Sequence, residues 1–201
     1  MAGCFHGIVP GFTGGISGGT ARARYRGAVN PETLPPAPGA AGIPGAVITV
    51  SDRCSRGEAE DRSGPLAVEL LAGIGVVAGV VVVPDGVDSV RRAIRAALKG
   101  GARFVLTTGG TGIGPRDLTP EGTRSLLTRE LPGVAEAIRA RGAVMLPAAM
   151  LSRGVAGIAP GAAGEALVVN VPGSPGAVRD AVAVLAPLVR HVVDQLGGGA
   201  H

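Results

Sequence analysis

Short runs rich in valine and isoleucine alternate with helix-forming segments along most of this 201-residue chain. Strands are expected at residues 46–51, 76–83, 103–107, 155–158 and 166–171, and helices at 63–72, 88–99, 120–129, 134–141 and 175–196. Such alternation is typical of βαβ units, in which a helix crosses over between two parallel strands. The sequence therefore predicts an α/β fold: a three-layer α/β/α sandwich with a mostly parallel sheet.

Local signals place individual elements within this pattern. The run 76–83 is almost all valine without polar alternation, as expected for a strand buried on both faces. Ser63 stands at a helix start as the expected N-cap, with Pro65 in the first turn. Pro187 is expected to kink or split the last helix.

Residues 1–45 differ in composition from the rest of the chain. They are rich in glycine and proline and show no periodic apolar pattern, so they are predicted to be a disordered extension or an upstream start that is not used. Residues 46–201 are expected to form one domain. Glycine and proline interrupt the stretch 5–16, which argues against a secretory signal, and no apolar run has transmembrane length. We expect a soluble, cytoplasmic protein.

The composition argues against several classes of function. The net charge of +4 is split evenly between the extension and residues 46–201, so it forms no basic stripe. With one Tyr, three Phe and no Trp there is also no platform for stacking bases, and nucleic-acid binding is not expected. Cys4 and Cys54 are too few for a disulfide framework or a thiolate metal cluster. The scattered histidines suggest neither a zinc site nor a nucleophilic triad.

Polar turns follow the expected strands at 51–53, 84–86, 107–117 and 170–175. In a parallel sheet these turns share one edge, where ligands of such folds bind. Asp52, Asp85 and Asp117 can then converge although they are distant in sequence. Aspartate is also common in turns for local reasons, and Ser174-Pro175 is first of all a helix start.

The segment 107–121, Thr-Thr-Gly-Gly-Thr-Gly-Ile-Gly-Pro-Arg-Asp-Leu-Thr-Pro-Glu, carries the strongest functional signal. Its glycines allow backbone N–H groups to turn toward one anion, and Asp117 brings a carboxylate to the same place. An anion site that also holds a carboxylate suits a divalent cation and phosphate chemistry. The segment matches neither the P-loop nor the complete dinucleotide fingerprint, and a plain flexible loop is the competing interpretation.

Taken together, several motifs resemble the molybdopterin adenylyltransferase family, the Mog/MoaB group that includes the G domain of gephyrin. They occur in family order from about residue 46 to the end of the chain. They are Val50-Ser51-Asp52-Arg53, Asp61-Arg62-Ser63-Gly64-Pro65, Val83-Pro84-Asp85, the segment 108–121, Leu131-Pro132-Gly133, Met150-Leu151-Ser152-Arg153 and the segment 170–175. No counterpart is recognised for the extension.

The resemblance implies Mg²⁺- and ATP-dependent adenylylation of molybdopterin, with pyrophosphate as the second product, in molybdenum cofactor biosynthesis. It implies a homotrimer and possible hand-over of the product to a molybdenum insertion protein. It assigns Asp85 and Asp117 as catalytic metal ligands and Ser152 as a catalytic residue near the pterin phosphate. The implied substrate and nucleotide contacts are Ser51, Asp52, Gly109, Gly110, Thr111, Gly112, Pro172, Gly173, Ser174 and Pro175. Arg116 can pair with Asp117 or contact phosphate.

Two departures from the family pattern are visible. Gly122 stands where many relatives carry alanine, and Gly176 where relatives often have a longer polar residue. Three other functions remain open: a MoaB-like paralogue that binds a pterin without adenylyl transfer, an enzyme of other specificity such as the related domains of molybdenum insertion or nicotinamide-nucleotide-processing proteins, and a structural α/β module.

Overall fold

The computed structural model describes residues 42–199. The predicted extension therefore lies, apart from residues 42–45, outside the described part of the chain. The strands are β1 (Ile43–Val50), β2 (Val76–Val83), β3 (Phe104–Thr108), β4 (Arg129–Glu130), β5 (Ala156–Ala159) and β6 (Ala166–Val171). The helices are α1 (Asp52–Ser55), α2 (Ser63–Ala72), α3 (Val87–Lys99), α4 (Thr119–Arg124), α5 (Pro132–Ala143), the 3₁₀ helix η1 (Pro147–Leu151), α6 (Pro175–Leu185) and α7 (Val189–Leu196).

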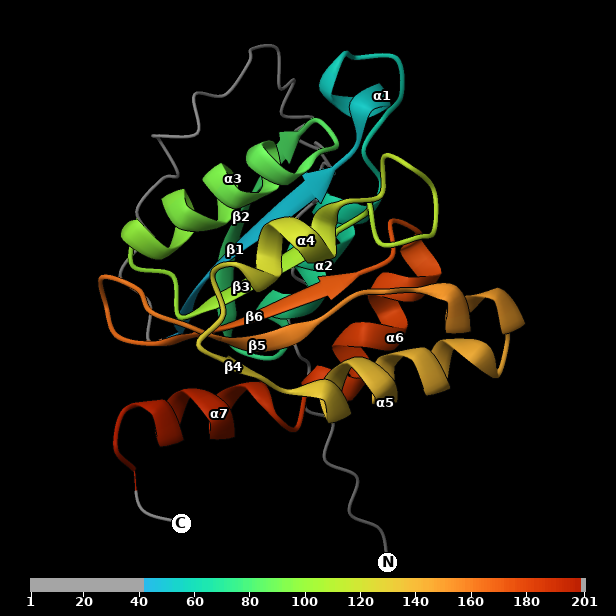
Figure 1. The fold of residues 1–201 in the computed structure, drawn as a ribbon. Helices are drawn as coiled ribbons and strands as arrows, with labels where there is room; N and C mark the ends of the chain where they lie inside the picture. The colour runs from blue at the N-terminus through green and yellow to red at the C-terminus, as the bar shows by residue number, and fades with distance from the viewer. Residues whose placement is uncertain (1–41, 200–201) are drawn as a thin grey trace, which may run out of the picture.

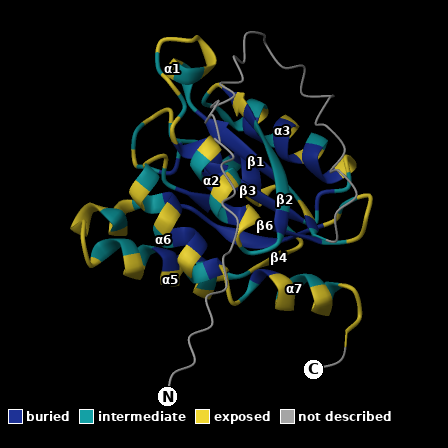
Figure 2. Cartoon of the chain, turned by 180° about the vertical axis from the view of Figure 1, so that it is seen from behind, coloured by how far each residue is buried: buried dark blue, intermediate teal, exposed yellow. Residues whose placement is uncertain are grey.

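The strands form one six-stranded sheet in the order β2-β1-β3-β6-β5-β4. β2, β1, β3 and β6 are parallel to one another, β5 pairs antiparallel with β6, and the two-residue edge strand β4 pairs antiparallel with β5. Helices α3 and α4 cover one face, and α2, α5 and α6 cover the other (Figures 1 and 2). The predicted α/β/α sandwich with a mostly parallel sheet is confirmed.

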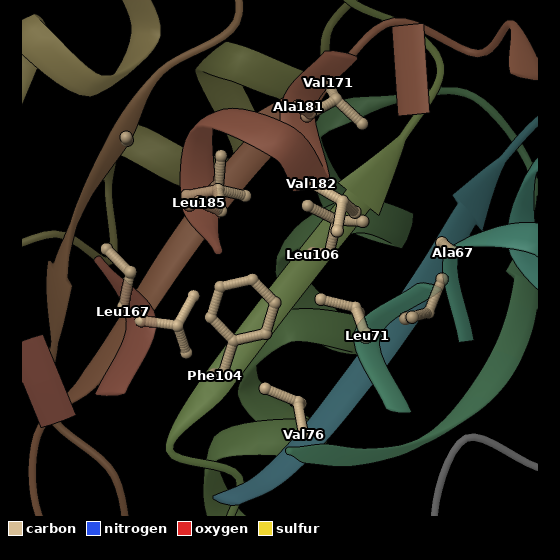
Figure 3. Close-up of a cluster of buried hydrophobic side chains, with 14 of the residues drawn as sticks. Ala67, Leu71, Val76, Phe104, Leu106, Leu167, Val171, Ala181, Val182 and Leu185 are labelled. Carbon is tan, nitrogen blue, oxygen red and sulfur yellow. The ribbon is translucent and has the colours of Figure 1, made fainter. Parts of the chain in front are cut away.

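The hydrophobic core lies in two layers, one on each face of the sheet. On the α2–α6 side, Phe104 lies between Leu71, Val76 and Leu167 (Figure 3), and all four side chains are almost fully buried. On the α3 side, alternate strand residues such as Ile48 and Val105 contact the apolar face of α3. Burial of residues from both faces of each central strand explains why these strands lack polar alternation.

Four local predictions were wrong or incomplete. β2 is an edge strand and Val82 is exposed, so its two faces are not both buried. α2 begins with Ser63 rather than being capped by it: the Asp61 carboxylate accepts hydrogen bonds from the N–H groups of Ser63 and Gly64, at 3.1 and 3.0 Å. α4 ends at Arg124 instead of continuing to 129, because the chain turns there and Arg129–Glu130 pairs with β5. α1 and η1 were not anticipated.

The split of the C-terminal helix was anticipated. α6 ends at Leu185 and α7 begins at Val189, with Pro187 between them. Gly122 has a packing role that its low helix propensity alone does not reveal. A Cβ there would lie 2.9 Å from the Val87 carbonyl oxygen and 3.0 Å from Val90 Cβ, so glycine allows α4 to approach α3 closely.

Candidate functional site

The ends of the four parallel strands bring the polar turns to one edge of the sheet. Val50 is in register with Val83, and Thr108 with Val171. Hydrogen bonds continue past the strands, from the Ser51 N–H to the Val83 carbonyl at 2.9 Å and from the Gly109 N–H to the Val171 carbonyl at 3.0 Å. The α1 turn and the 109–118 segment project from this same end of the sheet (Figure 1).

The segment 109–118, here called the glycine loop, depends on glycine at its first two positions. Gly109 and Gly110 have φ angles of 104° and 62°, which side-chain-bearing residues rarely adopt. A Cβ on Gly109 would lie 2.2 Å from the Val50 carbonyl oxygen, and one on Gly110 would lie 2.4 Å from Thr119 Oγ1. Thr119 secures this turn by donating from its hydroxyl to the Gly109 carbonyl at 2.9 Å. The loop therefore has a specific, tightly packed conformation and is not a flexible connection.

Asp52 and Asp85, in the turns after β1 and β2, form reciprocal hydrogen bonds. The Asp52 N–H donates to Asp85 Oδ2 at 2.8 Å, and the Asp85 N–H donates to Asp52 Oδ1 at 3.1 Å. Arg116, two-thirds exposed, reaches from the glycine loop to Asp52 Oδ2 at 2.8 Å and to the Asp85 carbonyl at 3.3 Å. Arg116 thus pairs with Asp52, a partner that the sequence did not suggest.

The carboxylates of Asp85, which borders the glycine loop, and of Asp117, which lies within it, both lie against glycines of the loop. Asp85 Oδ1 lies 3.2 Å from the position of a Cβ on Gly110, and Asp117 Oδ2 lies 2.8 Å from such positions on Gly112 and Gly114. The Gly114 N–H donates to Asp117 Oδ2 at 2.9 Å, so the loop folds around this carboxylate. Missing side chains at these glycines create the space that the two carboxylates occupy.

Some of the other predicted contact residues form local hydrogen bonds within the protein, and some line one of two cavities. Ser51 and Ser174 are N-caps, accepting hydrogen bonds from the N–H groups of Cys54 and Ala177, each at 3.2 Å. Thr111 is buried, and its hydroxyl accepts a hydrogen bond from Ser152 at 3.2 Å. Each of these hydroxyls is therefore already engaged with the protein.

One cavity, of about 280 Å³, opens between the α1 turn, the start of α2 and the 172–175 turn. It is lined by Ser51, Gly173 and Pro175 of the predicted set together with Thr49, Asp61, Arg62 and Thr108. A narrower cavity on the other side of that turn is lined by Ser152, Pro172, Arg139, Asn170 and Asp180. Asp85, Asp117 and the predicted glycines of the glycine loop (Gly109, Gly110 and Gly112) line neither cavity.

The turns around these cavities are tied to the glycine loop. Thr108 donates from its hydroxyl to the Pro172 carbonyl at 3.1 Å, and a Cβ on Gly173 would lie 3.2 Å from Gly109 Cα. Asn170, fully buried, donates from Nδ2 to the hydroxyls of Thr107 and Thr123 at 2.9 and 3.0 Å. Its place in the motif 170–175 signalled a role, but this network joining β6, β3 and α4 was not predictable.

Within residues 42–199, no three side chains of His, Cys, Asp or Glu lie close enough together to hold a metal ion. Two carboxylates with a phosphate-bearing ligand remain an adequate donor set for Mg²⁺, which keeps waters and is bound through one or two carboxylates plus substrate phosphates. None of the helices between residues 42 and 199 is long and apolar enough to cross a membrane.

The mostly parallel sheet, with its polar turns gathered beyond the strand ends, places this chain in the class of α/β proteins whose ligands bind at this edge of the sheet. Comparison with known proteins agrees. Residues 46–191 match the family described as the probable molybdopterin binding domain, and the chain belongs to that family.

Similar proteins of known sequence or structure carry related names. The chain is 40% identical over 148 residues to the molybdopterin adenylyltransferase of Pyrococcus furiosus, covering 73% of this chain and 87% of that one. It is 38% identical over 186 residues to the molybdenum cofactor biosynthesis bifunctional protein of Synechococcus elongatus, covering 92% of this chain but only 57% of that protein. A molybdopterin biosynthesis protein from Mycobacterium abscessus superimposes with a TM-score of 0.71 at 48% identity, covering 77% and 96% of the two chains.

Proposed function

We propose that this protein catalyses the Mg²⁺-dependent transfer of the adenylyl group of ATP to molybdopterin in molybdenum cofactor biosynthesis. The observation that carries the proposal is the placement of the Asp85 and Asp117 carboxylates against one glycine loop. The similarity to a molybdopterin adenylyltransferase over most of both chains supports it. The family resemblance extends the proposal to a cytoplasmic homotrimer that hands its product to a molybdenum insertion protein.

The proposed reaction needs no nucleophile from the protein. An oxygen of the terminal phosphate of molybdopterin attacks the α-phosphorus of ATP, a new P–O bond forms, and the bond to the bridging oxygen breaks to release pyrophosphate. The protein must bring two anions together in line and neutralise the charge on the triphosphate. This requirement agrees with a site made of backbone N–H groups, an arginine and carboxylates.

The two carboxylates have the donor chemistry that Mg²⁺ requires. Asp85 Oδ2 and Asp117 Oδ2 are each fixed by a backbone N–H, from Asp52 and Gly114. Within residues 42–199, no group donates a hydrogen bond to Oδ1 of either residue, which leaves these oxygens available. When bound there, Mg²⁺ would supply charge neutralisation on the phosphates.

The chain's other residues are assigned by their place around the loop. Gly109, Gly110, Thr111 and Gly112 would cradle phosphate through their backbone, while Ser152 would approach the pterin phosphate from the narrower cavity. Ser51, Gly173 and Pro175 line the wider cavity and Pro172 the narrower one, and these residues would contact the rest of the substrate. Asp52 and Ser174 line neither cavity and are assigned to substrate binding by the family resemblance alone. Arg116, whose guanidinium is largely exposed while it pairs with Asp52, would meet an incoming phosphate.

A second candidate is a MoaB-like protein that binds a pterin intermediate without transferring adenylate. Asp85 and Asp117 line neither of the two cavities beside the 172–175 turn, and this separation favours it. Two carboxylates fixed against a glycine loop have less use in a pure binding protein, which is why we favour catalysis.

Pyrophosphate release from molybdopterin and Mg-ATP separates the two functions. The wild-type protein is expected to release pyrophosphate, and Asp117→Asn to lose about 100-fold or more of this rate while still binding molybdopterin. Asp88→Asn, at an exposed carboxylate on α3, is the matched control and should retain the rate. Molybdopterin binding without pyrophosphate release by the wild-type protein would establish the binding function instead.

A further inference from the structure

Arg153, between η1 and β5, contacts the glycine loop at several points. Its Nε donates to the Gly112 carbonyl at 2.7 Å, and its Nη2 donates to the Asp117 carbonyl. Its Nη1 pairs with Glu121 Oε1 at 2.5 Å, and its backbone N–H donates to the Thr111 carbonyl at 2.8 Å. The residue thus joins η1, the loop and the first turn of α4.

These hydrogen bonds fix the two sides of the exposed tip of the loop, residues 113–116. Gly112 precedes the tip and Asp117 closes it, while Ile113 at the tip is 72% exposed. Inside the tip, the Asp117 N–H donates to the Gly114 carbonyl at 3.1 Å, and the Gly114 N–H returns a bond to Asp117 Oδ2. The spacing of the two sides therefore determines where the Asp117 carboxylate lies.

We infer that Arg153 is a positioning residue that holds the Asp117 carboxylate in place for the cation. This inference rests on the proposed function. Each of the three guanidinium nitrogens already has a protein acceptor, so Arg153 acts through the loop and not on phosphate. The planar guanidinium spreads its donors over three nitrogens that each meet a different acceptor, whereas a lysine ammonium carries its donors on a single nitrogen at the end of a flexible stem and does not reproduce this geometry.

Arg153→Lys tests the inference, with Arg103→Lys as the matched control. Arg103 also donates to three acceptors, the carbonyls of Glu165, Ala163 and Val193, and lies directly before β3, at the end of the strand opposite the glycine loop. Two quantities are measured without molybdopterin: the affinity for Mn²⁺ in the presence of ATP, by electron paramagnetic resonance, and amide hydrogen exchange across residues 112–117.

Arg153→Lys is expected to weaken Mn²⁺ binding about tenfold, as loss of an outer-shell partner typically does, and to speed amide exchange in the tip. Arg103→Lys should leave both unchanged. If Arg153→Lys does not fold, Glu121→Gln, which loosens the guanidinium on one side only, should give a smaller loss in the same direction.

Unchanged Mn²⁺ affinity with unchanged exchange in Arg153→Lys would overturn the inference, and so would equal losses in Arg103→Lys, which would show a general effect on stability. If the wild-type protein binds no Mn²⁺ with ATP, the proposed function fails. Exchange in the tip then still decides whether Arg153 holds the loop.

Discussion

The backbone N–H groups of Asp52 and Asp85 each donate to the other residue's carboxylate, at 2.8 and 3.1 Å. This reciprocal pair joins the turns after β1 and β2. It fixes Asp85 Oδ2, whereas no group within residues 42–199 donates a hydrogen bond to Asp85 Oδ1. Arg116 forms an ion pair with Asp52. Asp52 therefore supports the orientation of Asp85.

Replacing Asp52 separates its two roles. Asp52→Ala removes the acceptor of the Asp85 N–H and the partner of Arg116, and should lower the free energy of unfolding by about 1 kcal/mol. Asp52→Asn keeps an acceptor and loses only the charge pair with a largely exposed Arg116, so its loss should be smaller. Urea unfolding measures both. An equal loss in the two variants would show that the charge pair, not the amide contact, is what matters.

The glycine loop predicts a sharp difference between two glycine substitutions. Gly110→Ala places a Cβ 2.4 Å from Thr119 Oγ1 and 3.2 Å from Asp85 Oδ1 at a φ of 62°, and should destabilise the protein by about 1–3 kcal/mol. Gly133→Ala, in α5 with no atom within 4 Å of the new Cβ, should be neutral or stabilising by up to about 1 kcal/mol. Thermal and urea unfolding compare them, and an unaffected Gly110→Ala would contradict this loop conformation.

The Arg153–Glu121 pair predicts a pH-dependent stability. The hydrogen bond from Arg153 holds the pKa of Glu121 below its ordinary value of 4.5, against the opposing effect of burial. Because the folded-state pKa is the lower one, the stabilisation is present above 4.5 and is lost as pH falls through the folded-state pKa. At neutral pH Glu121→Gln should cost at most about 1 kcal/mol, since both side chains are more than one-third exposed.

Urea unfolding of wild type and Glu121→Gln over a pH series checks this prediction. The difference in unfolding free energy should narrow as the pH is lowered below 4.5. A difference that stays constant across the series would show that ionisation of Glu121 does not contribute.

Periodicity and turn chemistry predicted the central part of the fold well. The strands of the parallel sheet follow buried runs that tolerate few other structures, and Pro187 separated α6 from α7 as expected. The early end of α4 was missed because pairing of Arg129–Glu130 with β5, a contact between distant segments, overrides local helix preference. The cap of α2 was misassigned because Asp61 and Ser63 are both good capping residues, and only the structure shows that Asp61 accepts the bonds.

In the candidate site, too, local sequence signals were predictive, whereas contacts between distant segments were not. The polar turns that follow the expected strands indicated which segments meet at the sheet edge, because parallel strands place their carboxyl ends together. The partner of Arg116, the buried Asn170 network and the grip of Arg153 depend on side chains that meet across tens of residues. Such contacts have no periodic signal in a single sequence.

The shared cation is the central claim, and a crystal structure with Mn²⁺ and a non-hydrolysable ATP analogue tests it most directly. We predict one anomalous peak that contacts a carboxylate oxygen of both Asp85 and Asp117 at about 2.0–2.3 Å, together with phosphate oxygens of the nucleotide. A cation bound to the nucleotide alone, with either carboxylate turned away from it, would contradict the account.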